Sequence, residues 1–178
     1  MNIIYLAGIN NSEPLHWQRL WYRLLGGHWL EQTDWDHPRA VNWVACLQET
    51  LRAVSGPKIL LGHSLGSHLV AEWARTHRNS NLRGAFLVAP PDVEGMNFPR
   101  EASGFTPPLD LKLPFPSFIV ASRNDPYSTV DYSRRLADGW KSDFVDVGEK
   151  GHINLKSGLG FWEEGFKLFR AFCSSLSE

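Results

Sequence analysis

A serine enclosed by two glycines follows a short apolar run in this chain. Residues 62–66 read Gly-His-Ser-Leu-Gly, and apolar side chains continue at helical spacing through Leu65, Leu69 and Trp73. Gly-x-Ser-x-Gly after a strand and before a helix is typical of a nucleophile elbow, which exposes a serine hydroxyl at the edge of a sheet. The context predicts Ser64 as a nucleophile. Because the motif alone is weak, a purely structural glycine-bracketed turn is the alternative.

A serine hydroxyl is a poor nucleophile without a base beside it. Among the seven histidines, His152 stands apart, because it follows a short apolar run, 143–147, and a loop containing Gly151. That loop is expected at the same sheet edge as Ser64, so His152 is the predicted base, with a solvated surface histidine as the alternative. The other histidines lie in or beside expected helices or, for His63, next to the serine with a side chain expected to point elsewhere: His16, His28, His37, His63, His68 and His77.

The acid is expected after the preceding strand, since hydrolases of this kind carry Ser, Asp and His in that chain order. Residues 117–122 form an apolar run, and Asp125 follows it just before Pro126. Asp125 is therefore predicted to hold the tautomer of the histidine and to stabilise its charged form. An ordinary Asp-Pro turn is the alternative, and Asp146 and Glu149 are the fallback acids.

Two backbone amides are predicted to bind the developing oxyanion. One is the amide of Leu65 at the start of the expected helix, and the other is the amide of Ile9, or else of Asn10, in the loop after the first apolar run. Asn10 and His63 are also predicted to contact substrate.

The segment 90–116 has little periodicity and holds seven of the eleven prolines. Long irregular loops are often functional. The segment is predicted to form a lid or a pocket wall, with Phe98 and Phe105 binding substrate and Leu109 as a further lining residue. The alternative is a surface loop without a functional role.

The elements that must position these residues alternate between strand and helix. Four of the five apolar runs are nearly continuous, as in parallel strands covered on both faces. The alternation predicts an α/β fold with three layers and a doubly wound, mainly parallel sheet of five or six strands. The expected strands are residues 2–7, 58–62, 83–89, 117–122 and 143–147.

Helical stripes separate the runs. Asp36 as cap and Pro38 in the first turn are predicted to open the second helix, and Ser128 with Asp131 is predicted to form a capping box that opens another. The stripes are Trp17, Trp21, Leu24 and Leu25; Val44, Leu47, Leu51 and Val54; and Leu159, Trp162, Phe166, Phe169, Cys173 and Leu176.

Composition narrows the function classes. The chain has 178 residues, 43% of them hydrophobic, and a formal net charge of −1, which predicts one globular domain over residues 1–178 and argues against nucleic acid or anionic membranes as partners. The start of the chain does not read as a signal peptide, and the two cysteines, Cys46 and Cys173, show no disulfide or zinc spacing. A cytoplasmic location is therefore expected.

With these residues assembled, the chain resembles the small serine hydrolases of the YdeN and retinoblastoma-binding-protein type, a compact branch of the α/β-hydrolase superfamily. The resemblance spans essentially the whole chain and implies a minimal α/β-hydrolase fold, catalysis by Ser64, His152 and Asp125, and no cofactor or metal. His16 and Trp17 are assigned to the fold or the pocket floor. The markers lie in residues 8–21, 62–66, 113–127 and 151–154.

The predicted reaction is hydrolysis of a small acyl ester, with an amide or peptide bond as the second choice. Two alternatives stay open: a protein-binding module on a hydrolase scaffold, and an acyltransferase that uses the same three residues. The expected partner is a small acyl substrate, and nothing in the sequence supports a protein partner.

Overall fold

The apolar runs form one parallel sheet. In the computed structural model, which describes residues 1–176, six strands lie in the order β2-β1-β3-β4-β5-β6, and all neighbouring strands are parallel. The predicted doubly wound sheet is thus confirmed, and the last two residues of the predicted domain lie outside the described residues. The strands are β1 (Asn2–Leu6), β2 (His28–Trp29), β3 (Lys58–His63), β4 (Leu82–Val88), β5 (Ser117–Ala121) and β6 (Asp143–Asp146).

The strand order reverses between β1 and β3. From β1 the chain moves outward to β2, a two-residue edge strand that the sequence did not predict, and then returns to β3 and continues across the sheet to β6. Open α/β sheets bind their ligands at such a switch point, beyond the carboxyl ends of the strands. The loops after β1 and β3 are therefore the ones best placed to form a site.

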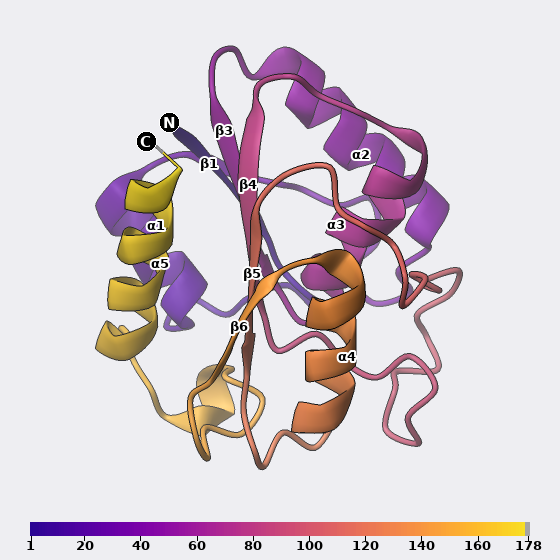
Figure 1. The fold of residues 1–178 in the computed structure, drawn as a ribbon, viewed down its shortest axis with the longest axis vertical. Coiled ribbons are helices and arrows are strands. Elements are labelled where there is room, and N and C mark those ends of the chain that lie inside the picture. Colours follow the sequence, from indigo (N-terminus) through magenta and orange to yellow (C-terminus); the bar gives the residue numbers. More distant parts are fainter. Residues whose placement is uncertain (177–178) are drawn as a thin grey trace.

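Helices cover both faces of the sheet and make three layers (Figure 1). Helices α1 and α5 lie on one face, and α2, α3 and α4 lie on the other. No helix in residues 1–176 is long and apolar enough to cross a membrane. The helices are α1 (Trp17–Leu25), α2 (Ala40–Ala53), α3 (Leu65–Thr76), α4 (Val130–Trp140) and α5 (Glu163–Ser175), and η1 (Leu155–Ser157) is a short 3₁₀ turn.

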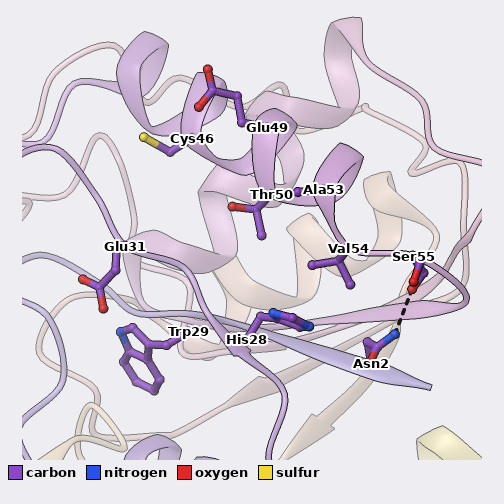
Figure 2. A pocket seen from close by; sticks show the side chains of 10 residues that line it. All are labelled: Asn2, His28, Trp29, Glu31, Cys46, Glu49, Thr50, Ala53, Val54 and Ser55. Atoms are coloured by element: carbon purple, nitrogen blue, oxygen red, sulfur yellow. Dashed lines mark hydrogen bonds between the residues drawn. The ribbon is translucent and has the colours of Figure 1, made fainter.

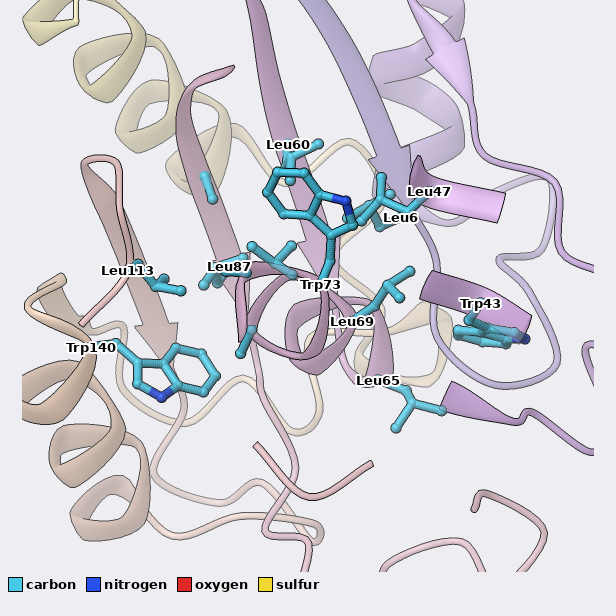
Figure 3. Packing of buried hydrophobic residues seen from close by; sticks show 14 of the residues in the cluster. Leu6, Trp43, Leu47, Leu60, Leu65, Leu69, Trp73, Leu87, Leu113 and Trp140 are labelled. Carbon is cyan, nitrogen blue, oxygen red and sulfur yellow. The ribbon is translucent and has the colours of Figure 1, made fainter. Parts of the chain in front are cut away.

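Helix α3 is the most deeply buried helix, because it packs on the centre of the sheet. Its Leu69 and Trp73 are fully buried beside Leu60 of β3, as Figure 3 shows. Trp43 of α2 and Trp140 of α4 extend this core on either side. The first residues of α3, which carry the elbow, are therefore held by the largest apolar cluster of the molecule.

Aromatic rings fill the opposite face. Trp17 and Trp21 of α1 lie with ring centroids 4.5 Å apart, and Trp21 stacks on Trp162 at 5.9 Å. Phe169 of α5 also packs on Trp21. Aromatic contacts of this kind add to the free energy gained by burial. They fix α1 and α5 to each other next to the loop that carries His152.

Both predicted helix caps are wrong, since the observed cap of α2 is Arg39 in place of Asp36 and that of α4 is Thr129 in place of Ser128. Helix α2 has Arg39 as its N-cap without a side-chain hydrogen bond, and the carboxylate that accepts backbone amides in the preceding turn belongs to Asp34, so Asp36 and Pro38 lie outside the helix. Helix α4 is capped by Thr129, whose hydroxyl accepts the Tyr132 amide. The hydroxyl of Ser128 instead faces that of Ser133, which replaces the predicted capping box.

Candidate active site

Ser64 lies in a sharp turn between β3 and α3. Its backbone is in a rare conformation for a side chain other than glycine, with φ 54° and ψ −125°. The surrounding fold holds this strained turn. The Ser64 amide donates to the Val88 carbonyl of β4 at 2.8 Å, and Gly66 packs so closely on β1 that an added methyl group would collide with the Leu6 carbonyl. The predicted elbow geometry is present.

The three predicted polar side chains converge. Nε2 of His152 lies 2.8 Å from the Ser64 hydroxyl oxygen, and Nδ1 of His152 lies 2.9 and 3.0 Å from the two carboxylate oxygens of Asp125. They come from the loops after β3, β5 and β6, at the carboxyl edge of the sheet. A carboxylate on Nδ1 favours the tautomer in which Nε2 accepts the serine proton.

Asp125 is the acid that reaches the histidine, and the fallback acids do not. Its side chain is 2% exposed, and one of its oxygens also accepts the Tyr127 amide at 2.9 Å. Asp146 is instead paired with the Arg123 guanidinium at 2.7 Å, which lowers the pKa of Asp146, while Glu149 is exposed.

Two residues that the sequence analysis missed join the loops of the acid and the base. The Asn124 side-chain oxygen accepts the Gly151 amide at 2.7 Å and the Ser122 hydroxyl at 3.1 Å. The same hydroxyl accepts the Lys150 amide at 2.9 Å. In the sequence, Ser122 and Asn124 gave only a weak indication of this role, because small polar residues are common at the end of a strand. Together they fix the distance between Asp125 and His152.

Two side-chain hydrogen bonds fix the backbone at His152 and Ile153. Nε2 of His63 donates to the His152 carbonyl at 2.9 Å, and the Trp17 indole donates to the Ile153 carbonyl at 2.7 Å. The ring of Tyr127 packs on the imidazole of His152, with centroids 4.5 Å apart. These contacts orient the imidazole, as a general base requires. Trp17 thus serves the fold, as predicted, and does so by anchoring the histidine loop.

Two further histidines lie near His152 and stay neutral. Burial, followed by the nearby His152, lowers the pKa of His16 to about 3. Burial, followed by the nearby His16, lowers the pKa of His63 well below its usual value. The ring of His63 lies 4.8 Å from that of His16 and 5.1 Å from that of His152. Neither ring adds a positive charge beside the base at neutral pH.

Two amides are positioned to receive an oxyanion. Leu65 is the first residue of α3, where helix N–H groups lack intrahelical acceptors. Gly8 packs against Ser64 so closely that a side chain at position 8 would strike it, which brings the Ile9 loop beside the serine. The Asn10 amide already donates to the Trp35 carbonyl at 2.8 Å. This leaves Ile9 as the better of the two predicted donors in that loop.

A cavity of about 200 Å³ opens above Ser64. Asn10 and His63 line it, as do Ser64 and His152 themselves, so these predicted site residues share one space. The full lining is Gly8, Ile9, Asn10, Asn11, Glu13, His16, His63, Ser64, Pro91, Pro99, Tyr127, His152, Asn154 and Lys156.

The aromatic residues of segment 90–116 do not line this cavity, which corrects the prediction. Phe105 is 3% exposed and packs against Trp43 in the core. Phe98 is half-buried against the same core, and Leu109 is exposed. Phe98 and Phe105 pack on the core and fix the segment in place. Its contribution to the pocket wall comes from Pro91 and Pro99.

A second cavity lies between β2 and α2, far from the three loops. Its volume is about 570 Å³, and Figure 2 shows Cys46 and Glu49 of α2 on one wall and His28 and Trp29 of β2 on the other. In the part of the chain that the structure describes, no group of three side chains could hold a metal ion.

Comparisons with known proteins identify structures with the same fold. A protein described as a YdeN-like hydrolase of Pectobacterium atrosepticum shares 29% identity, over 98% of this chain and 91% of its own, with a TM-score of 0.86. An α/β hydrolase from a lagoon-sediment metagenome has a TM-score of 0.74 at 14% identity, covering 100% and 92% of the two chains. The esterase RhEst1 of Rhodococcus has a TM-score of 0.68 at 15% identity, covering 99% and 91%.

The fold is therefore that of a minimal α/β hydrolase. The family of proteins described as serine hydrolases matches residues 3–171, and the chain belongs to that family. A comparison with curated proteins gives no match.

Proposed function

We propose that this protein hydrolyses small acyl esters through an acyl-enzyme formed on Ser64. The single observation that carries the proposal is the chain of contacts from the Ser64 hydroxyl through the His152 imidazole to the Asp125 carboxylate, at 2.8 and 2.9 Å. A serine turn that served only the fold would not require an oriented base and acid beside it.

In the first half-reaction, Ser64 Oγ attacks the ester carbonyl carbon while its proton passes to Nε2 of His152. The oxyanion that forms accepts hydrogen bonds from the amides of Leu65 and Ile9. The carbon–oxygen bond to the leaving alcohol then breaks, and that oxygen takes the proton from Nε2. The products of this step are the free alcohol and an ester of Ser64.

In the second half-reaction, water replaces the alcohol. His152 accepts a proton from the water as its oxygen attacks the acyl carbon, and the proton returns to Ser64 Oγ as the acid leaves. Asp125 stays ionised throughout and stabilises the imidazolium. The chemistry needs no group beyond these residues and water, and the proposed partner is accordingly a small-molecule ester.

The test is turnover of p-nitrophenyl acetate by the wild type and by Ser64→Ala. We expect the variant to lose at least about 10⁴-fold in kcat, because the alanine cannot form the acyl-enzyme. Ser80→Ala, at an exposed serine, is the matched control and should keep wild-type turnover. Equal turnover by the wild type and Ser64→Ala would overturn the proposal.

The same assay separates the two alternatives. A protein-binding module would leave a panel of short esters unhydrolysed. An acyltransferase would form new esters when alcohols are added, in place of the free acid. Product analysis with added methanol or butanol therefore decides between transfer and hydrolysis.

A further inference from the structure

The cavity above Ser64 is small. Its volume of about 200 Å³ lies below the range of about 300–1,000 Å³ found for sites that bind drug-sized ligands. An acyl group of a few atoms fits such a space, whereas a long chain must leave it.

The lining offers little surface to an alkyl chain. Ile9, Pro91, Pro99 and Tyr127 are its apolar or aromatic members, with no leucine, valine or phenylalanine beside them. The phenylalanine that could have formed such a wall, Phe105, is buried in the core instead. The binding free energy of an alkyl chain grows with the apolar surface that it buries. A longer acyl chain should therefore gain little binding free energy in this cavity.

The same lining offers hydrogen-bond donors. The side chains of Asn10 and Lys156 line the cavity, and neither makes a hydrogen bond or ion pair within residues 1–176. The side chain of Asn154 accepts a backbone amide of the η1 turn, which directs its oxygen to the protein and leaves its NH₂ group as a donor. Asn11 behaves alike, because its oxygen accepts the amide of Ser12 at 2.8 Å.

Acceptors are fewer around this rim. Glu13 is the one carboxylate that lines the cavity, and it forms no ion pair with Lys156 in the described residues. Asn10 and Lys156 are exposed, so water hydrates their donors, and a ligand oxygen can replace that water where an alkyl group of equal size cannot.

We propose that the pocket selects short acyl groups that carry an additional oxygen acceptor, such as alkoxy-, oxo- or hydroxyacyl esters, and that Lys156 with the neighbouring asparagines recognises that oxygen. This inference rests on the proposed ester hydrolysis at Ser64 and specifies its substrate class.

The experiment compares p-nitrophenyl methoxyacetate with p-nitrophenyl butyrate, which differ by one oxygen in place of one methylene. Each kcat/KM is divided by the rate of hydrolysis by hydroxide, so that the greater intrinsic reactivity of the methoxyacetyl ester is removed. We expect a corrected preference of about tenfold for methoxyacetate, and an octanoate rate about tenfold below butyrate. A corrected preference for butyrate, or an octanoate rate equal to or above butyrate, would overturn the inference.

Lys156→Met tests the recognition residue. It removes the donor while keeping an unbranched side chain, and it should lower the methoxyacetate preference about fivefold. Lys167→Met, on α5 away from the cavity, is the matched control and should keep the preference. An unchanged preference in Lys156→Met would show that Lys156 does not recognise the additional oxygen.

Failure of this inference and failure of the proposed function look different. If a fluorophosphonate labels Ser64 and octanoate is the best ester, hydrolysis stands and only the substrate class falls. If Ser64 is not labelled and no ester is turned over, the proposed function itself falls.

Discussion

The two cavities differ in a way that size does not capture. The cavity between β2 and α2 is the larger, at about 570 Å³ against about 200 Å³. Its lining comes from β1, β2, α2 and the residues next to them, and the hydrogen bond drawn in Figure 2 joins the Asn2 side chain to the Ser55 backbone carbonyl. The lining of the smaller cavity comes from the segments that follow five strands, β1, β3, β4, β5 and β6. Two of its residues, Ser64 and His152, contact each other, and His152 also contacts Asp125 behind it.

The difference shows that convergence, rather than volume, defines a reactive site. All the strands are parallel, so their carboxyl ends meet at one edge, and polar groups far apart in the chain gather there. The cavity between β2 and α2 lies beside an edge strand instead, and its lining comes from β1, β2, α2 and the residues next to them.

The largest effect expected beyond the loss of Ser64 is at the acid. Asp125→Asn keeps the size of the side chain but removes the charge that holds the His152 tautomer. We expect kcat to fall by about 10⁴-fold. Steady-state kinetics measure this, with Asp146→Asn as the control, because Asp146 pairs with Arg123 and not with His152. A similar loss in both variants would show that kcat depends on the negative charge at this edge of the sheet and not on contact with His152.

A smaller effect is expected at His63, which donates to the backbone of His152 and does not touch the serine hydroxyl. His63→Leu removes this donor and should lower kcat about 10- to 100-fold with little change in KM. His63→Gln can still donate and should recover part of the loss. If the loss appeared in KM instead, His63 would be a substrate contact, as the sequence analysis predicted.

Acid should weaken the fold beneath the reactive cavity. The pKa of His16 is lowered to about 3 and that of His68 to about 4 by burial, and that of His63 is also lowered. In the unfolded chain each has a pKa of about 6.5, so below that pH the unfolded state binds protons that the folded state does not. As the pH is lowered below about 6.5, the free energy of unfolding should then fall by up to about 1.4 kcal/mol per pH unit for each of these histidines.

Urea unfolding between about pH 7 and about pH 5 measures this slope. His68→Gln can still donate to the Pro91 carbonyl that His68 contacts, but it cannot titrate. Its slope should be smaller than that of the wild type by up to about 1.4 kcal/mol per pH unit. A variant slope equal to that of the wild type would show that His68 does not contribute.

The smallest effect is expected in the larger cavity. Glu49→Gln changes a charge on its α2 wall, and Glu49 makes no hydrogen bond or ion pair within the described residues. We expect ester kcat/KM to stay within about twofold of the wild type. A change of tenfold or more would show that the two cavities are coupled.

The sheet and the convergence of the three polar side chains could be predicted because both follow from local order. Apolar runs mark the strands, and Ser64, Asp125 and His152 each stand just after one of them. Strand β2 was missed because two residues are too few to show a period. The helix caps were misplaced because several residues near each start, such as Ser128 and Thr129, can accept a backbone amide.

The pocket walls could not be predicted for a different reason. Phe105 and Pro91 belong to the same irregular segment, yet one is buried against Trp43 and the other lines the cavity. That outcome depends on contacts with helices far away in the sequence. The link between Asn124 and Gly151 is likewise visible only when two loops are side by side.

The most direct measurement of the central claim is covalent labelling with a fluorophosphonate, read by intact mass and peptide mapping. We expect one adduct per chain, on Ser64, formed rapidly by the wild type and at least about 10³-fold more slowly by His152→Ala, since the base activates the hydroxyl. Labelling of another residue, or equally fast labelling of Ser64 without His152, would contradict it.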